Sequence, residues 1–253
     1  MKAFLEKYIA LLALVVAVLL WEAACKLFAI PVFILPSPTA IFASVTTLDA
    51  GRWATHILAT LSVALSGFLL AIVIALPLAI AIVSSKLLAR LVLPWLIVIQ
   101  STPVVAIAPI IVVTLGSGML PRVVITTLIS FFPLVISTAT GMNSVPSELL
   151  ELSKTLRAPR NREYWQIRMP YAVPYIFSAL KVAITLSIIG AVVAEFVAAD
   201  QGLGYLILFS TSSFKIPLAF ASLFLLVVCS LMLYGLVSWL QKRLFPWSID
   251  AKK

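Results

Sequence analysis

The chain reads VVITTLISFFPLVISTATGM over residues 123–142 and then NSVPSELLELSKTLRAPRNREYWQIR over residues 143–168. The first stretch has no charged residue and, as a helix, is long enough to cross a bilayer core of about 30 Å. The second stretch carries many charged side chains and two prolines, so it must contact water. This junction predicts a membrane-spanning helix that leads into a polar segment at the membrane surface.

The composition of the whole chain is that of a membrane protein. Hydrophobic residues make up 63% of the 253 residues and charged residues only 11%, which is outside the range of soluble domains. Apolar runs like 123–142 also occupy residues 8–30, 55–83, 91–115, 171–197 and 216–240. We therefore predict an all-α integral membrane protein with about six transmembrane helices, forming a single transmembrane domain over residues 1–253.

The positive charges indicate the orientation of these helices. The net charge is +9, and most lysines and arginines fall in alternate loops and at the termini, where they include Lys2, Lys7, Lys252 and Lys253. Short loops rich in Lys and Arg stay in the cytoplasm. We therefore predict a multi-pass protein with residues 143–168 and both termini in the cytoplasm. Charges scattered among apolar runs indicate a lipid bilayer as partner and argue against nucleic acid.

Residues 147–156 have the pattern of an amphipathic helix. Ser147 is expected to cap its N-terminus, and Glu148 and Glu151 lie in the first turn, where the helix dipole favours acidic side chains. Leucines recur at helical spacing, at Leu149, Leu150, Leu152 and Leu156. This apolar stripe needs a covering surface, which is either a partner protein or the membrane and the chain's own helices.

Prolines indicate where the neighbouring elements begin and end. Pro159 is expected to end the amphipathic helix, a second short helix is expected over residues 162–168, and Pro170 is expected to begin the next span. In the first outer loop, the prolines of residues 35–38 predict an extended turn before a short helix over residues 39–48.

The apolar residues 206–209 in the last outer connection are too few to span a membrane. They are also too apolar to lie free in water. We expect a shallow re-entrant or interfacial segment there.

A few polar residues interrupt the apolar runs. The candidates for a transport pathway are Gln100, Ser101, Thr102, Thr185 and Ser187. The first three precede Pro103, which frees backbone groups that hydroxyls can satisfy, unless these side chains line a pathway instead. Small polar residues also serve helix packing, so both interpretations apply to all five.

Two acidic residues lie in or beside the apolar runs. Glu22 and Lys26 are four residues apart on the same helical face, so we predict a structural ion pair. Glu195 closes the fifth run near the outer face, where it can lie at the lipid headgroups or take part in gating or docking.

A family signature is recognisable in the polar segment. The spacing of residues 151–153, Arg157, Ile167, Met169 and Pro170 resembles the Glu-Ala-Ala, three residues, Gly, nine residues, Ile-x-Leu-Pro signature of ABC importer permeases. Arg157 stands at the glycine position. Because Arg enters the tight turn that Gly permits only at a cost, we expect either a straighter helix end or an Arg157 that pairs with an acidic group of a partner.

Two further motifs resemble one branch of that family. Leu35-Pro36-Ser37-Pro38 is similar to the Leu-Pro-Ser-Pro that follows the first span in permeases for sulfonates, taurine, nitrate and thiamine-precursor pyrimidines. Ala194-Glu195-Phe196, followed by Gly202-Leu203-Gly204-Tyr205-Leu206, resembles the same branch after its fifth span. The chain thus resembles the transmembrane subunit of a type I ABC importer.

The resemblance implies several partners. This chain would form the pathway in the bacterial cytoplasmic (inner) membrane without catalysis, while two ATPase subunits bind and hydrolyse ATP with Mg²⁺. Its 253 residues contain no Gly-x-x-x-x-Gly-Lys-Ser/Thr phosphate loop. A second permease copy completes the pathway, as a homodimer or with a related permease, and an extracytoplasmic binding protein delivers the solute.

The resemblance also assigns roles to particular residues. Within a coupling segment over residues 143–168, those expected to contact the ATPase are Glu148, Glu151, Leu152, Leu156, Arg157 and Ala158. Glu195 is assigned to an outer gate or docking site. The solute is a small polar molecule, either an organic anion such as a sulfonate or a pyrimidine or vitamin precursor.

The main alternative is an ion-coupled secondary transporter or channel. Such a protein is expected to carry acids near the membrane midplane, where this sequence offers only Glu22 and the break at residues 100–103. An ABC exporter would extend long polar helices into the cytoplasm. An intramembrane enzyme would need a nucleophile with a base, or a metal cluster.

Overall fold

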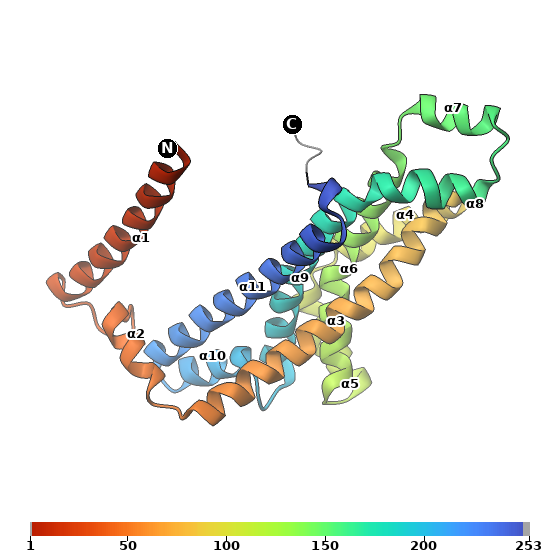
Figure 1. The fold of residues 1–253 in the computed structure, drawn as a ribbon. Coiled ribbons are helices and arrows are strands. Elements are labelled where there is room, and N and C mark those ends of the chain that lie inside the picture. The colour runs from red at the N-terminus through yellow and green to blue at the C-terminus, as the bar shows by residue number, and fades with distance from the viewer. Residues whose placement is uncertain (1, 250–253) are drawn as a thin grey trace. The chain divides into compact units, whose positions relative to one another are not determined.

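The structure, a computed structural model, describes the backbone of residues 2–249 and the side chains of residues 8, 9 and 11–249. Over this range the chain is helical and forms no strand (Figure 1). The helices are α1 Lys2–Leu27, α2 Pro38–Val45, α3 Ala50–Ser84, α4 Lys86–Ser101, α5 Val104–Leu115, α6 Met119–Asn143, α7 Ser147–Thr155, α8 Arg160–Arg162, α9 Met169–Ala198, α10 Leu203–Ser212 and α11 Ile216–Leu244. A π-helical turn, η1, covers Glu163–Arg168, and a 3₁₀ turn, η2, covers Pro246–Ser248.

The chain divides into two compact units, which are described separately. The first contains Met1–Ala59 and Gln201–Val227, and the second contains Thr60–Asp200 and Val228–Lys253. The second unit therefore holds α4 to α9 with parts of α3 and α11. The side chains of Lys2, Lys7, Lys252 and Lys253, which support the predicted orientation, lie outside the described part.

The second unit is organised around α6 and α9, which pack along one another (Figure 1). Glycines allow the two backbones to approach closely. A Cβ on Gly141 would lie 2.9 Å from the Ala172 Cα, and a Cβ on Gly190 would lie 2.8 Å from the Thr126 Cα. Small residues of this kind are typical of helix contacts in membranes. The tight α6–α9 pair provides a stiff frame for the segment that joins these two helices.

The apolar helices match the predicted spans in most positions. Among the described residues, α3, α6, Arg160–Ala198 and α11 are each long and apolar enough to cross a membrane, and α4 with α5 forms a fifth candidate. The remaining predicted span, residues 8–30, corresponds to α1. These observations confirm an all-α membrane protein, with four or five spans by this criterion where about six were predicted.

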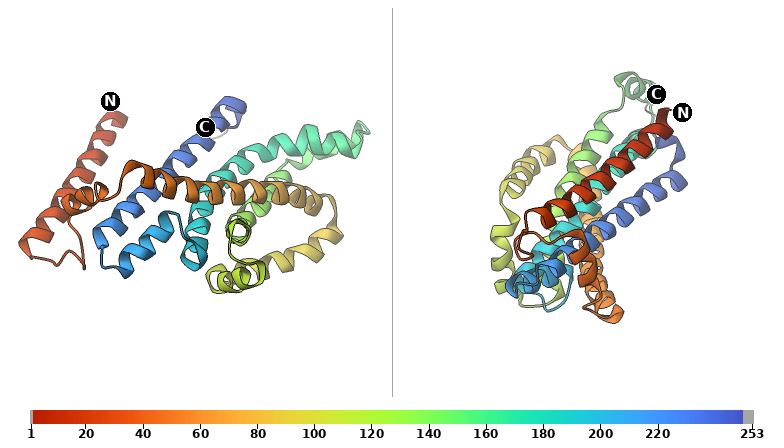
Figure 2. Two further views of the ribbon diagram at one scale, coloured as in Figure 1. Left: turned by 90° about the horizontal axis from the view of Figure 1, so that it is seen from below. Right: turned by 90° about the vertical axis from the view of Figure 1, so that its left-hand side faces the viewer.

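The third predicted run, residues 91–115, is not one straight helix. α4 ends at Ser101, α5 begins at Val104, and the two axes are bent by 96° (Figure 2). Pro103 explains the break, because it has no N–H to donate and restricts the residue before it to an extended conformation. Thr102 is indeed extended, with ψ of 123°.

Pro170 lies in the first turn of α9, where the next span was predicted to begin, but no new helix starts there. The helix is continuous from Arg160 to Ala198, a length of 39 residues. The backbone shifts to a π-helical turn just before the proline, where the Met169 N–H donates to the Tyr164 carbonyl five residues back. Pro170 thus falls where the hydrogen-bond register changes, and its missing N–H does not interrupt the helix.

The short outer helices lie close to their predicted positions. α2 covers Pro38–Val45 instead of residues 39–48, and the Ser37 hydroxyl accepts a hydrogen bond from the Ala40 N–H at 3.3 Å. α10, Leu203–Ser212, contains the predicted apolar piece 206–209 but is longer.

Candidate functional site in the segment between α6 and α9

α7 projects beyond the ends of α6 and α9, and short connections join it to α6 and to α8 (Figure 1). Pro146 precedes the first helical residue, and its carbonyl accepts a hydrogen bond from the Leu149 N–H at 3.2 Å. The prediction that Ser147 caps this helix is therefore wrong, because Pro146 occupies the N-cap position and Ser147 is the first helical residue. Glu148 lies in the first turn as predicted.

The predicted leucine stripe of α7 separates into two faces. Ser153 is buried and Leu149 and Leu150 are half-buried, so this face turns toward the rest of the chain. Leu152 and Leu156 are 54% and 71% exposed. They share a face with the exposed acids Glu148 and Glu151, because side chains three or four residues apart lie on one side of a helix. We call Glu148, Glu151, Leu152 and Leu156 the α7 outer face.

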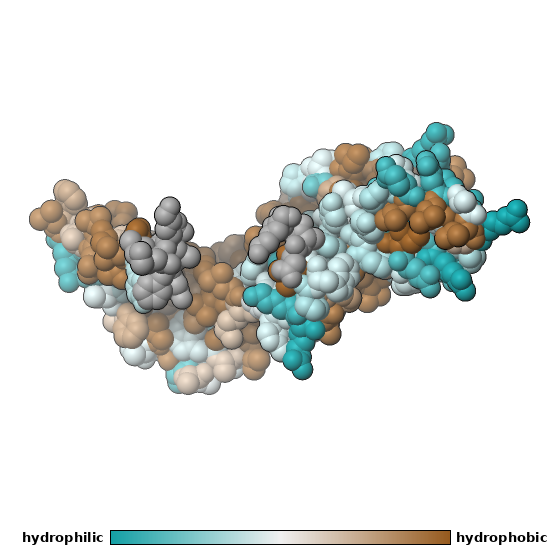
Figure 3. Space-filling view, turned by 45° about the horizontal axis from the view of Figure 1, so that its top comes forward, coloured by the Kyte–Doolittle hydropathy of each residue, from teal (hydrophilic) through white to brown (hydrophobic). Residues whose placement is uncertain are grey.

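The hydropathy of the surface agrees with this division. In the region of α7 and α8, Figure 3 shows an apolar patch surrounded by hydrophilic side chains. An exposed apolar patch with a polar rim is typical of a protein contact surface.

α7 ends in a tight turn at Arg157, although arginine was expected to enter such a turn only at a cost. Arg157 has φ of +51°, the left-handed conformation that glycine adopts most easily. The Arg157 N–H donates to the Lys154 carbonyl at 2.9 Å and the Ala158 N–H donates to the Ser153 carbonyl at 3.0 Å, which is the Schellman pattern. The expectation of a straighter helix end is therefore wrong. Arg157 keeps the turn of the family signature despite its side chain.

Arg168 ties the segment back to α6. Its Nε donates to Glu163 Oε1 at 2.8 Å, and its Nη1 donates to the Met142 carbonyl at 3.1 Å. The same Nη1 lies 3.5 Å from Asn143 Oδ1. The side chains of Arg168 and Glu163 are only 16% and 15% exposed, so the ion pair is largely shielded from water. The π-helical turn makes it possible, because it brings residues five apart into register.

Tyr164 extends this network to α3. Its ring lies 5.3 Å from the Arg168 guanidinium carbon, and its hydroxyl donates to the Val83 carbonyl at 3.4 Å. The ends of α3 and α6 and the turn η1 are thus connected through Arg168 and Tyr164. The sequence alone did not predict this network. The sequence signal for it is a pair of opposite charges five residues apart, Glu163 and Arg168, close to Pro170. Such a pair does not meet on an ordinary α-helix, so the signal was not interpretable without the π-helical turn.

Two of the three predicted pathway residues near Pro103 bond to the local backbone. The Ser101 and Thr102 hydroxyls each donate to the Val98 carbonyl at 2.9 Å, which satisfies the backbone at the end of α4. Gln100 is exposed on the same end of the helix. These hydrogen bonds agree with the structural alternative for the two hydroxyls, and the pathway role of these residues stays a prediction.

Of the three candidates on α9, Ser187 and Glu195 are buried, whereas Thr185 is partly exposed. Thr185 and Ser187 donate to carbonyls three residues earlier, both at 2.8 Å, and Ser187 is fully buried. Glu195 is 1% exposed near the end of α9. None of the three is brought next to the α7 outer face.

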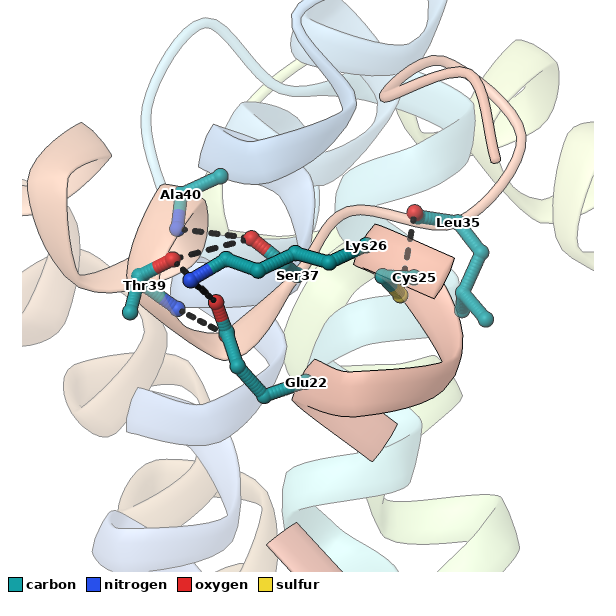
Figure 4. A network of polar contacts seen from close by, with 7 residues as sticks. All are labelled: Glu22, Cys25, Lys26, Leu35, Ser37, Thr39 and Ala40. Atoms are coloured by element: carbon teal, nitrogen blue, oxygen red, sulfur yellow. Dashed lines mark hydrogen bonds and ion pairs between the residues drawn. The ribbon is translucent and has the colours of Figure 1, made fainter. Parts of the chain in front are cut away.

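The predicted pair of Glu22 and Lys26 is confirmed, with Oε1 and Nζ 2.8 Å apart (Figure 4). Glu22 also accepts hydrogen bonds from the Thr39 N–H at 3.1 Å and the Thr39 hydroxyl at 2.8 Å. The carboxylate therefore fastens the first turn of α2 to α1. Lys26 and Thr39 thus occupy the Glu22 carboxylate and join two elements of the chain, which favours a structural role for Glu22 over ion coupling.

His56 makes a contact that the sequence did not suggest. Its Nδ1 accepts a hydrogen bond from the Gly202 N–H at 3.1 Å, and its ring stacks on Tyr205. Gly202 has φ of +129°, which explains why glycine occurs at this position of the Gly-Leu-Gly-Tyr motif. The motif thus has a local structural cause.

The fold and this segment define the class of the protein as the membrane component of a binding-protein-dependent transporter. The family model for binding-protein-dependent transport system inner membrane components matches residues 67–247. The chain belongs to this family, and it is a permease subunit of an ABC importer.

Curated relatives extend over most of the chain. A riboflavin transport system permease protein of Chloroflexus aurantiacus is 37% identical over 92% of this chain and 88% of its own length. A formylaminopyrimidine transport permease protein of Halalkalibacterium halodurans is 31% identical over 90% and 91%. An ABC transporter permease protein of Haemophilus influenzae is 35% identical over 94% and 97%.

A solved structure supports the fold. A chain of the MetNI methionine ABC transporter in an inward-facing conformation matches with a TM-score of 0.65 at 18% identity, covering 73% of this chain and 92% of that chain.

Proposed function

We propose that this chain forms the translocation pathway of an ATP-driven importer and that α7 couples the pathway to an ATPase subunit. The observation that carries the proposal is the exposed α7 outer face on a segment that Arg168 anchors to α6. An anchored helix with an uncovered apolar face is suited to transmit the motion of a partner to the spans.

The chemistry of the α7 outer face matches a cleft with an apolar floor. Leu152 and Leu156 are already partly covered, so burying their remaining exposed area contributes about 1–2 kcal/mol for each side chain. Glu148 and Glu151 lie beside them and can accept hydrogen bonds from basic or backbone groups of the partner. The left-handed turn at Arg157 directs the chain back toward the bundle, and we include Arg157 and Ala158 in the contact.

The energy source and the remaining subunits are part of the same proposal. Two ATPase subunits bind ATP and Mg²⁺, and this chain takes no part in hydrolysis. Two permease copies enclose the pathway, and we favour a homodimer because the sequence has no internal repeat that would supply a second half. A binding protein delivers solute from outside, and both termini lie in the cytoplasm of a bacterial cell.

The relatives support a heteroaromatic vitamin or vitamin precursor as solute. The relatives at 37% and 31% identity are named for riboflavin and formylaminopyrimidine, whereas a Bacillus subtilis relative named for aliphatic sulfonates is 24% identical. A small planar heterocycle is therefore a better candidate than a sulfonate.

The coupling role is tested with Glu151→Ala combined with Leu152→Asp. The complete complex of permease, ATPase and binding protein is reconstituted in liposomes, and solute uptake and ATP hydrolysis are measured on the same preparation. We expect uptake to fall at least tenfold, which corresponds to a loss of about 1.4 kcal/mol of interaction free energy with the ATPase. The thermal stability of the permease should not change.

Asp49→Ala is the matched control for loss of an exposed acid. Asp49 belongs to the other compact unit and pairs with Arg52 at 3.4 Å. Uptake should be unchanged in this variant. Normal uptake in the α7 double variant would exclude the proposed coupling surface.

A further inference from the structure

A cavity of about 840 Å³ in the second unit opens between α9, α11 and the turn η2. α9 lines it with Tyr171, Tyr175, Ser178 and Lys181, and α11 lines it with Tyr234, Ser238, Gln241 and Lys242. Within each helix these residues recur every three or four positions, with Gln241 and Lys242 both following Ser238 at that spacing, so each set forms one continuous face. Hydroxyl groups, aromatic rings and two ammonium groups therefore point into a common space.

The charge of the cavity has one sign. Lys181 and Lys242 are its charged lining residues, and no described lining residue is acidic. In the described part of the chain neither lysine belongs to an ion pair. Lys181 lies roughly 16 Å along α9 from Pro170, within the apolar span. A half-buried ammonium at such a position favours an anionic partner.

One wall of the cavity is fixed before any ligand binds. The Gln241 amide donates to the Ser248 hydroxyl at 3.0 Å, and that hydroxyl donates to the Phe245 carbonyl at 2.7 Å. The Phe245 ring packs against Phe177 of α9 with ring centroids 5.5 Å apart. The turn η2, which carries Trp247, is thus held against the bundle.

The surroundings of the cavity are suited to a ligand with an anionic head and apolar chains. The tyrosines and Trp247 are the residue types that gather at the headgroup level of a membrane. Next to Tyr234, α11 exposes Leu231 and Met232 by 65% and 69%, which offers a surface for acyl chains. Basic pockets between spanning helices bind phospholipid headgroups in this way.

We propose that this cavity binds the phosphate of an anionic phospholipid, with Lys181 and Lys242 pairing with the phosphate and the hydroxyls of Ser178 and Ser238 donating to it. The acyl chains lie along the exposed apolar face of α11. This site is separate from the α7 outer face, and the inference does not depend on which solute is transported.

The test measures retained lipid on the purified full-length permease in mild detergent by native mass spectrometry. Phosphatidylglycerol is titrated against the wild type and against the double variant Lys181→Gln with Lys242→Gln. We expect the variant to bind phosphatidylglycerol roughly twentyfold to thirtyfold more weakly, because each basic residue at an anionic surface contributes about a factor of five. Lys86→Gln removes an exposed cation from α4 and should leave retention unchanged.

Three further arms decide the identity of the ligand. Phosphatidylcholine should bind weakly to both proteins, and the charge-preserving Lys181→Arg should bind phosphatidylglycerol like the wild type. Inorganic phosphate alone should not compete at concentrations similar to those of the lipid. Equal retention by the wild type and the double variant, competition by inorganic phosphate, or a permease copy that displaces the lipid on dimerisation would each overturn the proposal.

Discussion

Replacing Arg168 with methionine tests whether the coupling segment is held by the Arg168 network. Methionine keeps the length and apolar stem but removes the pair with Glu163 at 2.8 Å and the bond to the Met142 carbonyl at 3.1 Å. A hydrogen bond to a charged group contributes about 1.5–3 kcal/mol, and breaking a buried pair costs about 3–5 kcal/mol. Because both partners keep about 15% exposure, we expect a loss of about 2–4 kcal/mol.

The unfolding free energy of the purified permease, measured by titration with a denaturing detergent, gives this loss directly. The decisive comparison is the double variant Arg168→Met with Glu163→Gln. Most of the cost in the single variant comes from a carboxylate left without its partner, so neutralising Glu163 should restore part of the stability. In the reconstituted importer, Arg168→Met should lower uptake more than ATP hydrolysis.

Two outcomes would refute this reasoning. If the double variant loses as much as the sum of its two single variants, Arg168 and Glu163 do not interact in the folded protein. If Arg168→Met retains wild-type stability and wild-type uptake, the network does not hold the coupling segment. Arg168→Lys is the intermediate control, because lysine keeps the charge but cannot reproduce the forked geometry of the guanidinium.

Two further predictions concern backbone geometry and use thermal unfolding. Arg157→Gly should stabilise the folded permease by about 0.5–1 kcal/mol. It removes the cost of about 1–2 kcal/mol for a left-handed non-glycine residue, but the greater freedom of glycine in the unfolded chain offsets part of that gain. An equal gain in Arg157→Ala would contradict the argument. Gly141→Ala should destabilise by about 1–3 kcal/mol, since the new Cβ would lie 2.7 Å from the Tyr175 Cβ. Gly235→Ala, which meets nothing within 4 Å, should be neutral or stabilising by up to about 1 kcal/mol, and similar losses in both glycine variants would refute the packing argument.

The sequence predicted the elements whose signal is local and repeated. The apolar runs that became α3, α6 and α11 were placed within a few residues, because the bilayer length and the absence of charge determine them. The ion pair of Glu22 and Lys26 was predicted for the same reason, since four residues is one turn of a regular helix.

The sequence did not predict features that depend on an irregular backbone. Pro170 indicated a helix start, but the π-helical turn before it absorbs the proline and aligns Glu163 with Arg168. Arg157 indicated a straighter helix end as one alternative, but two hydrogen bonds close the end of α7 and maintain the left-handed turn. For the candidate site, the pattern of residues 147–156 identified α7, whereas the choice of exposed leucines required its packing against the bundle.

The unbroken helix from Arg160 to Ala198 has a mechanical consequence. At about 1.5 Å per residue its 39 residues have a contour length of roughly 58 Å, and the helix curves along its course (Figure 2). If the helix moved as one rigid body, a tilt of about 10° applied to the end beside α7 would carry the opposite end through at most roughly 10 Å. Arg168 lies near the end beside α7, so under the proposed coupling its contacts with Glu163 and the Met142 carbonyl would be the point about which a small rotation produces a larger displacement at the far end.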